Sequence, residues 1–213
     1  MSITFIVLLI VAALILVAAL WRFASRRQRL PCPVWLRWLV ELDNPFTKTN
    51  RAAFIVETLA LAEDMTVVDA GCGPGRLTVP LARRVGSAGR VVALDIQPGM
   101  IDRARARTEA AGYTNVEFIV AALGDGGLPS NNFDRAVLVT VLGEIPNREA
   151  ALAELFSALK PGGILAIVEV IFDPHFQTRN KVTSLAISSG FRERAFFGHS
   201  LAYVILFEKP NGV

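Results

Sequence analysis

Cysteine and histidine are scarce in this chain of 213 residues, which contains two of each. The cysteines are Cys32 and Cys72, and Cys72 lies within a glycine-rich turn, where a disulfide to Cys32 would be out of place. Free thiols are typical of a protein in a reducing compartment. Internal repeats and low-complexity tracts are also absent, which gives no support to a repeat architecture or a long disordered region. No metal ion is expected.

Charged side chains are missing from residues 1–21, and residues 2–21 form an uninterrupted apolar run. A helix rises ~1.5 Å per residue, so this run would span the roughly 30 Å hydrocarbon core of a bilayer. We therefore predict one transmembrane helix, with residues 1–23 as the anchor and Trp21 at the interface. A cleaved signal peptide fits less well, because a basic n-region is missing and the run exceeds the usual ~7–15 residues. A buried soluble helix is the remaining alternative.

Positive charge is concentrated just after the apolar run. Residues 22–51 contain seven lysines or arginines and two acids, a net charge of +5 against +3 for the whole chain, so residues 52–213 carry −2. The positive-inside rule places the basic segment and everything after it in the cytoplasm. The predicted localisation is therefore a single-pass membrane protein with a cytoplasmic domain. Such a local basic segment does not indicate a nucleic-acid surface spread over the fold.

A short helix is expected within the basic juxtamembrane segment, residues 24–44. Trp35, Trp38, Leu39 and Leu42 recur at helical spacing. Trp and Leu beside basic residues fit a helix that lies in the headgroup zone of a membrane. The other interpretation is a helix that packs on the core of the domain that follows, and both stay open.

Strands and helices alternate over residues 45–213. Strands are expected at 66–70, 91–94, 116–120, 134–140 and 164–170, with two closing strands at about 192–197 and 201–208. Helices are expected at 49–62, 76–85, 99–111, 147–159 and 179–188. This alternation, with buried apolar strands, predicts an open and mainly parallel α/β sheet. Ligands bind such sheets at the carboxyl ends of the strands.

Residues 67–78, Val-Val-Asp-Ala-Gly-Cys-Gly-Pro-Gly-Arg-Leu-Thr, predict a strand end, a tight turn and a helix start. Glycine permits the turn and lets a ligand lie against bare backbone. Asp95 follows Gly75 at the end of the next strand, where a carboxylate can accept two ribose hydroxyls. Two cofactor classes fit this pattern, the nicotinamide or flavin dinucleotides and S-adenosylmethionine. Asp69 favours the second, because an acid suits a cationic amino group and sulfonium and would repel a pyrophosphate.

The same stretch closely resembles motif I of the class I S-adenosylmethionine-dependent methyltransferases (methyltransferase domain, type 11/25-like). The resemblance runs from about residue 45 to 209 and includes Leu94-Asp95-Ile96, Leu128-Pro129 before Phe133-Asp134, and Leu159-Lys160-Pro161-Gly162-Gly163. It implies a Rossmann-like, seven-stranded, mainly parallel sheet with helices on both faces, in which the last two strands form an antiparallel edge. The expected organisation is thus an anchor (1–23), a juxtamembrane segment (24–44) and a methyltransferase domain (45–213).

The resemblance also implies a cofactor, S-adenosyl-L-methionine, and residues that bind it. Asp69 and the backbone of Gly71, Gly73 and Gly75 would face its methionine end. Asp95 would bind the ribose and Ile96 would flank the adenine. Many relatives hold the adenine amino group with an Asp just after strand three. Here Ala122 and Leu123 occupy that place, so either the backbone or Asp125 would make the contact, and Asp125 is equally a plain turn residue.

The acceptor side of the pocket is expected after strand four, at residues 141–146. This stretch is not the Asn/Asp-Pro-Pro-Tyr/Phe pattern of enzymes that methylate amino groups of nucleobases or glutamine. There is no spare cysteine for RNA C5 chemistry and no inserted base-flipping domain. Nucleic acid is therefore not an expected partner.

The candidate general bases are Glu144 and His175, followed by Glu169 and Asp173. A histidine titrates near neutrality, which suits a base that takes a proton from the methyl acceptor. Each has a structural alternative: Glu144 could orient a loop, His175 could be a surface-loop residue, and Glu169 could be a satisfied strand-end carboxylate. The remaining histidine, His199, fits a turn between the closing strands.

Three functions follow, in order of preference. The first is a membrane-tethered methyltransferase whose acceptor is a lipid or lipid-like molecule, such as a phospholipid headgroup, an isoprenoid quinone precursor or a hydrophobic thiol. The second is a methyltransferase for a soluble small molecule that is merely localised to the membrane. The third is a non-catalytic S-adenosylmethionine-binding scaffold. The sequence does not name the acceptor, because function resides in the pocket rather than in the fold.

Overall fold

The computed structural model describes residues 2, 5–10, 12–13, 16–17 and 47–212. Positions 5–10, 12–13 and 16–17 are helical. Within these described parts of the chain, no helix combines the length and the apolar character that a membrane span requires. The predicted anchor, residues 1–23, is described only in part, and the predicted juxtamembrane helix in 24–44 lies outside the described residues.

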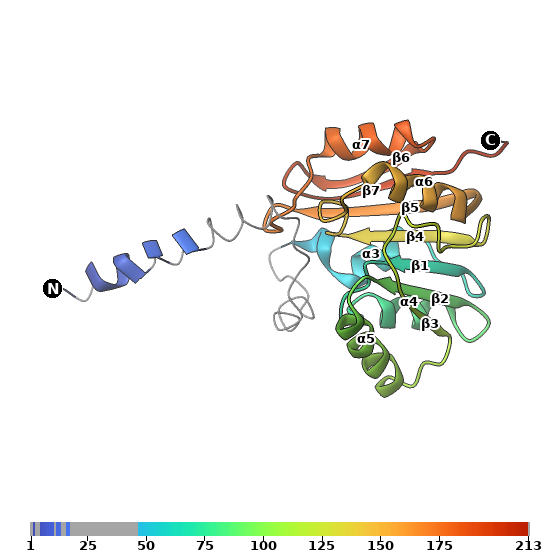
Figure 1. Cartoon of the computed structure of the whole chain (residues 1–213), viewed down its shortest axis with the longest axis horizontal. Coiled ribbons are helices and arrows are strands. Elements are labelled where there is room, and N and C mark those ends of the chain that lie inside the picture. Colours follow the sequence, from blue (N-terminus) through green and yellow to red (C-terminus); the bar gives the residue numbers. More distant parts are fainter. Residues whose placement is uncertain (1, 3–4, 11, 14–15, 18–46, 213) are drawn as a thin grey trace.

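Seven strands form one sheet in the order β3-β2-β1-β4-β5-β7-β6. Figure 1 shows this sheet running through the domain, with helices on both sides. The strands are β1 (Thr66–Ala70), β2 (Arg90–Asp95), β3 (Val116–Val120), β4 (Phe133–Val139), β5 (Leu159–Val170), β6 (Arg192–His199) and β7 (Ala202–Glu208). The pairs among β1 to β5 are parallel, whereas β7 is antiparallel to both β5 and β6. The Rossmann-like α/β fold with a seven-stranded, mainly parallel sheet is therefore confirmed.

Helices cover both faces of the sheet. They are η2 (Lys48–Asn50), α3 (Ala52–Thr58), α4 (Thr78–Val85), α5 (Pro98–Ala110), α6 (Arg148–Ala158) and α7 (Arg179–Ser188). Local sequence explains where two of them begin. Pro98 is the first residue of α5, a position where the missing N–H donor is not needed. The Asn147 side chain caps α6 by accepting from the Ala150 N–H at 3.0 Å. The apolar residues of α3 and α4 pack on one face, and those of α6 and α7 on the other.

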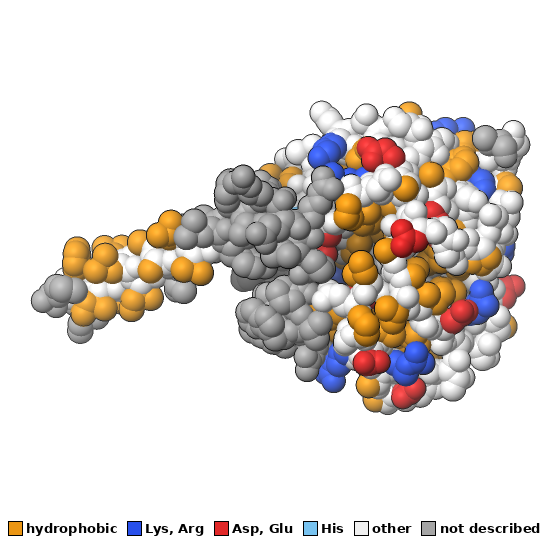
Figure 2. Space-filling view, viewed as in Figure 1, with side chains coloured by type: hydrophobic (Ala, Val, Ile, Leu, Met, Phe, Trp, Pro, Cys, Tyr) orange, Lys and Arg blue, Asp and Glu red, His pale blue; other side chains and the backbone are white. Residues whose placement is uncertain are grey.

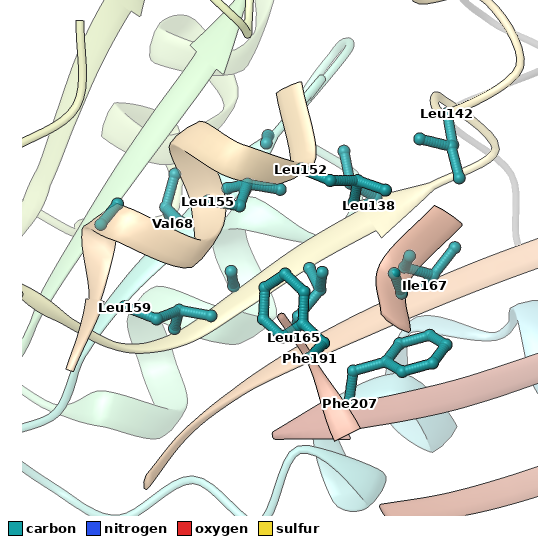
Figure 3. Packing of buried hydrophobic residues seen from close by; sticks show 14 of the residues in the cluster. Val68, Leu138, Leu142, Leu152, Leu155, Leu159, Leu165, Ile167, Phe191 and Phe207 are labelled. Atoms are coloured by element: carbon teal, nitrogen blue, oxygen red, sulfur yellow. The ribbon is translucent and has the colours of Figure 1, made fainter. Parts of the chain in front are cut away.

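Most of the core divides into two clusters, because consecutive strand residues point to opposite faces of the sheet, and a small third cluster contains Ile101 and Ala104 of α5. Val67 belongs to the cluster under α3 and α4, and Val68 to the cluster under α6 and α7. Figure 3 shows Leu152 and Leu155 of α6 lying over Val68 and Leu138, within this second cluster. On the outside, apolar side chains gather between α5 and α6, and charged side chains are scattered around them (Figure 2). Nearly every residue of β1, β2 and β7 is buried, which explains their apolar runs, whereas the edge strands β3 and β6 are half-buried or exposed.

The structure corrects two predicted boundaries and the direction of one closing strand. The helix expected at 49–62 is a short η2 followed by α3, which ends at Thr58. The strand expected at 164–170 begins earlier, at Leu159, because Leu159 pairs with Phe133 before an irregularity in the β4–β5 register. The closing strands pair antiparallel to each other as expected, yet only β7 runs against the sheet, since β6 pairs antiparallel to it in turn.

The strand order reverses at β1, whose neighbours are β2 on one side and β4 on the other. Such a reversal leaves a crevice at the carboxyl ends of the two central strands, where α/β sheets bind ligands. The turns after β1 and β4 meet there closely: a Cβ on Gly71 would lie 2.4 Å from Cγ2 of Val141. Gly71 also has a φ of +73°, which disfavours any side chain.

A buried hydrogen bond joins the two ends of the glycine-rich turn. Thr78, the first residue of α4, donates its hydroxyl to Oδ2 of Asp69 on β1 at 2.7 Å, and both residues are buried. Burial raises the pKa of Asp69 to about 6, although the Thr78 hydroxyl and the nearby Arg76 charge act in the opposite direction. The strand and the helix are therefore tied across the turn by one acceptor and one donor.

Substitution of Thr78→Val tests this tie. The variant keeps the shape of the side chain but leaves the Asp69 oxygen without its donor, so we expect the free energy of unfolding to fall by about 1–3 kcal/mol. The matched control is Thr108→Val, because the buried Thr108 hydroxyl donates only to the Ala104 carbonyl of its own helix. Chemical denaturation at neutral pH measures both. Equal losses in the two variants would contradict the role of the bond.

Candidate functional site

Three glycines of the turn after β1 have different roles. Gly75 lets α4 approach α5, because a Cβ there would lie 3.0 Å from the Ala104 backbone. Gly73 instead faces open space: with φ at +53°, a Cβ on it would meet nothing within 4 Å. The turn thus leaves room for a ligand above bare backbone, as the glycine spacing predicted. Within the turn, Cys72 has a buried free thiol whose pKa is raised by burial and by the carboxylates of Asp69 and Asp95.

Asp95 joins the turn after β1 to the end of β2. Its Oδ2 accepts the Gly73 N–H and its Oδ1 accepts the Gln97 N–H, both at 2.9 Å. A carboxylate offers about four acceptor sites, so capacity remains for ligand hydroxyl groups. Burial raises the pKa of Asp95, while the main-chain N–H groups that it accepts lower it. An acid at this place, next to the space above Gly73, fits the ribose of S-adenosylmethionine.

The residues expected around the adenine lie beside this acid. Ile96 directly follows Asp95 and is 59% exposed, so an apolar side chain is available at the mouth of the crevice. The Ala121 N–H donates to the Asp95 carbonyl at 3.1 Å, which brings the end of β3, with Ala122 and Leu123, next to the end of β2. Asp125 is exposed.

Glu154 of α6 holds the loop after β3, a contact that the sequence did not reveal. Its carboxylate accepts the N–H of Gly124 and, at 2.9 Å, that of Leu128. Glu154 lies 26 residues beyond Leu128. In the sequence it looks like any acid on the solvent-exposed face of a helix. The backbone N–H groups of this loop are thus fixed next to the predicted adenine site by a residue distant in sequence.

Arg76 is a second contact that the sequence did not reveal. Its guanidinium donates to the carbonyl of Asn50 at 2.7 Å and to the Asn50 side-chain oxygen at 3.1 Å. The start of the described domain is therefore tied to the cofactor turn.

Glu144 and His175 come together on the acceptor side, although they are 31 positions apart in the sequence. His175 Nδ1 lies 3.6 Å from Oε1 of Glu144, and the histidine is buried. The loops that carry them are in direct contact, because a Cβ on Gly143 would lie 1.9 Å from the His175 carbonyl oxygen. Arg148 fixes the first loop by donating to the carbonyls of Leu142 and Gly143 at 2.8 and 2.7 Å. The prediction that His175 could be a surface residue is wrong.

Glu169, at the end of β5, binds the main chain of the loop that carries His175. One of its oxygens accepts the Gln177 N–H at 3.0 Å, and Tyr203 donates to the Gln177 carbonyl at 2.6 Å. The other oxygen, Oε1, is buried and has no hydrogen-bond partner among the described residues. Burial is the main reason why the pKa of Glu169 is raised to about 8, and Asp173 and Glu144 raise it further. The prediction of a fully satisfied strand-end carboxylate is therefore wrong.

A cleft of about 330 Å³ opens beside this pair of loops. It is lined by Gly143, Arg148, His175, Phe176, Gln177, Thr178 and Lys181. Asp173 lies on the outer side of the same loop and accepts the His175 N–H at 2.6 Å. His199 is exposed and is the last residue of β6, where it pairs with Ala202 and its Nδ1 accepts the Leu201 N–H at 3.3 Å. The prediction that it lies in the turn is therefore wrong, because β6 extends up to the turn.

No group of three His, Cys, Asp or Glu side chains within the described residues is arranged to hold a metal ion.

A seven-stranded sheet that reverses at β1, an open glycine turn there and a carboxylate at the end of β2 define the class I S-adenosylmethionine-dependent methyltransferases. Comparison with known proteins agrees with this class. The family described as "Methyltransferase domain" matches residues 61–195, and the chain belongs to it. The cofactor of this protein is S-adenosyl-L-methionine.

Relatives of known name come from quinone biosynthesis. The protein named ubiquinone/menaquinone biosynthesis C-methyltransferase UbiE is 33% identical over 117 residues in Enterobacter sp. (strain 638), covering 54% of this chain and 47% of that protein. In Cronobacter sakazakii the identity is 33% over 129 residues, covering 60% and 51%. The chain thus spans about half the length of these relatives.

Solved structures share the fold at lower identity. A SAM-dependent methyltransferase from Aquifex aeolicus has a TM-score of 0.75 and 22% identity, covering 84% of this chain and all of that one. The [4+2]-cyclase SpnF has a TM-score of 0.68 and 17% identity, covering 77% and 81%. These similarities show the fold alone.

Asp95→Ala should weaken S-adenosylmethionine binding at least tenfold, because hydrogen bonds to a charged group contribute about 1.5–3 kcal/mol each. Isothermal titration calorimetry measures the affinity, and circular dichroism checks that the variant is folded. The matched control is Asp102→Ala, which removes an exposed carboxylate from α5. Wild-type affinity in a folded Asp95→Ala protein would contradict the ribose assignment.

Glu169→Gln should change the pH dependence of stability. The folded protein keeps the Glu169 proton up to a pKa of about 8, whereas the unfolded chain loses it near 4.5. The contribution of this group is thus fully present below the unfolded value and is lost as the pH rises towards about 8. The advantage of wild type over Glu169→Gln should shrink by on the order of a few kcal/mol between about pH 5 and pH 9.

Denaturation curves at several pH values measure this effect. The exposed Glu149 of α6 provides the control, since Glu149→Gln should leave the pH dependence of wild type unchanged. Parallel profiles for wild type and Glu169→Gln would show that Glu169 is ionised in the fold.

Proposed function

We propose that this protein is a membrane-tethered methyltransferase that methylates a lipid-like acceptor of the isoprenoid quinone-precursor type. The Glu144–His175 pair supports the proposal, because it supplies a base in the loops after β4 and β5, at the end of the sheet where α/β folds bind their ligands. The names of the UbiE relatives support a quinone-type acceptor and transfer to carbon. The identity of the acceptor and the methylated atom are part of the proposal.

Transfer of a methyl group to a hydroxyl, a thiol, a primary or secondary amine or an aromatic ring carbon replaces one hydrogen, so one proton is released overall. The cofactor, when bound, supplies an electrophilic methyl group. For transfer to a ring carbon of a quinol, His175 would take the proton of the neighbouring ring hydroxyl, and the carboxylate of Glu144 at 3.6 Å would stabilise the imidazolium that forms. After the carbon is methylated, its own proton leaves and the ring oxygen regains one, so the net loss is one proton. Arg148 keeps the Glu144 loop in place through two main-chain carbonyls. The chain's own contribution is therefore to position the acceptor and to move its proton.

Tethering follows from the uncharged run at 2–21 and the basic segment at 22–51. A run of this length can cross a bilayer, and the arginines after it would lie on the cytoplasmic side together with the domain. A membrane-bound enzyme would meet an isoprenoid acceptor directly in the bilayer. The proposed localisation is thus a single-pass membrane protein with a cytoplasmic methyltransferase domain.

A soluble acceptor is the second candidate, and the cleft next to His175 favours it. Four of its lining side chains are polar or charged besides the histidine, namely Arg148, Gln177, Thr178 and Lys181. A small polar thiol, amine or hydroxyl compound would suit such a lining better than a long apolar tail.

Transfer of labelled methyl groups separates the two candidates. The full chain, in vesicles, is incubated with labelled S-adenosylmethionine and either a demethylated quinol that carries an isoprenoid tail or the same quinol ring without a tail. We expect label in the lipid phase, on a ring carbon, and a clear preference for the tailed compound. Equal use of the tail-free ring, or label found only in soluble metabolites, would contradict a lipid-like acceptor.

His175→Ala should lower kcat by about 10²–10⁴, the usual contribution of a general base, with little change in cofactor affinity. The matched control is His199→Ala, which removes the exposed histidine at the end of β6. A Glu144→Gln variant should give an intermediate loss and shift the pH–rate profile, because the charge beside the imidazole is removed. If both histidine variants kept the same activity, the base would have to be another group.

A further inference from the structure

Two large apolar side chains are exposed at the end of the sheet where the acceptor loops lie. Phe172, in the loop after β5, is 69% exposed, and Leu201, in the turn before β7, is 49% exposed. A hydrogen bond of 2.7 Å from the Ile171 N–H to the Leu201 carbonyl joins the two segments. We call Phe172 and Leu201 the apolar lip. Single exposed hydrophobic residues are common, so the lip needs support from its surroundings.

The exposure of Phe172 is fixed by the backbone. The Asp173 N–H donates to the Val170 carbonyl at 3.0 Å, so Phe172 occupies a tight turn at the very end of β5. The loop beyond it is held on its inner side by the bonds of Glu169 and Tyr203 to Gln177. These hydrogen bonds hold the main chain on both sides of Phe172, in the same loop that carries the buried His175.

The chain also enters the domain at this end. Thr49 of η2 packs against the β6–β7 hairpin, because a Cβ on Gly198 would lie 2.9 Å from its Cγ2. That hairpin includes Ala202, which pairs with Val170 at the end of β5. Figure 1 shows the described domain beginning at the end of the sheet where β5 runs out. The described domain therefore begins, at residue 47, at the same end of the sheet as the lip.

Basic side chains accompany the lip at the same end. Lys48 and Arg51 are exposed where the described domain begins, and Lys181 is exposed at the start of α7, beside the cleft of His175. Apolar groups that insert shallowly, with cations that meet anionic headgroups, are the features of an interfacial membrane contact.

We propose that the apolar lip inserts into the surface of a lipid bilayer that contains anionic headgroups, and so turns the acceptor side of the domain towards the membrane. This inference rests on the proposed function, because the tether brings the domain to the bilayer. It adds an orientation: the cleft beside His175 would open at the headgroup level, where the reactive ring of a lipid-like acceptor is accessible without leaving the membrane.

Spin labels on the full chain test the proposal. Single cysteines replace Phe172, Leu201 or, as the control, Ile187, in a Cys32→Ser background, while Cys72 is buried and stays. Ile187 is 54% exposed, but it lies near the end of α7, which leads away from the lip towards the start of β6, at the opposite end of the strands. The protein is reconstituted in vesicles of phosphatidylethanolamine and phosphatidylglycerol. Collision rates with oxygen and with a water-soluble nickel chelate report the depth of each label.

We expect the labels at 172 and 201 to favour oxygen over the nickel chelate severalfold relative to the label at 187. Replacing phosphatidylglycerol by a zwitterionic lipid should reduce this preference, since Lys48, Arg51 and Lys181 lose their partners. If the protein bound vesicles while all three labels stayed in water, insertion of the lip would be contradicted and the tether would be supported. Labels at 172 and 201 shielded from both reagents without vesicles would show that the chain covers its own lip. A full chain that does not bind vesicles would contradict the tether itself.

Discussion

The carboxylate of Asp95 is the contact on which the cofactor side of this domain depends. It accepts one N–H from the turn after β1 and one from Gln97, the second residue after β2, so it fixes the relative position of two loops that belong to different βα units. A parallel sheet brings these loops to the same edge, but it does not by itself set their distance. The carboxylate that accepts these two main-chain N–H groups still has acceptor sites for the hydroxyl groups of a ribose. One side chain can therefore serve both local folding and cofactor binding.

The acceptor side is built on a different principle, in which buried polar groups hold two loops against each other. Gly143 is in contact with the His175 backbone, Arg148 binds the carbonyls of the first loop, and Glu169 binds the second. Buried polar networks are costly unless their members find partners, so such contacts specify one arrangement of the loops. The arrangement brings Glu144 beside His175. Glu169 keeps an oxygen buried without a hydrogen bond to the described residues, which explains why its neutral form is favoured.

The cofactor side and the acceptor side each contact the first residues of the described domain. Arg76 binds Asn50 from the cofactor turn, and Thr49 packs on the β6–β7 hairpin from the other side. The beginning of the described domain is thus held between the cofactor turn and the edge of the acceptor side. A tether attached at this place would act directly on the orientation of the site, which is why the exposed lip and the uncharged N-terminal run belong to one hypothesis.

The sequence by itself determined the fold class, the cofactor and the residues of the cofactor turn. Strand and helix periodicity are local, and the spacing of Asp69, the glycines and Asp95 lies within a single βαβ unit, so short-range pattern is sufficient there. The sequence also identified Glu144 and His175 as separate candidates. It did not show that they form a pair, that Glu169 is partly unsatisfied, or that Glu154 and Arg76 hold the loops. These are contacts between residues far apart in the chain, and only the packing of the loops at one edge of the sheet decides which of many polar side chains meet there.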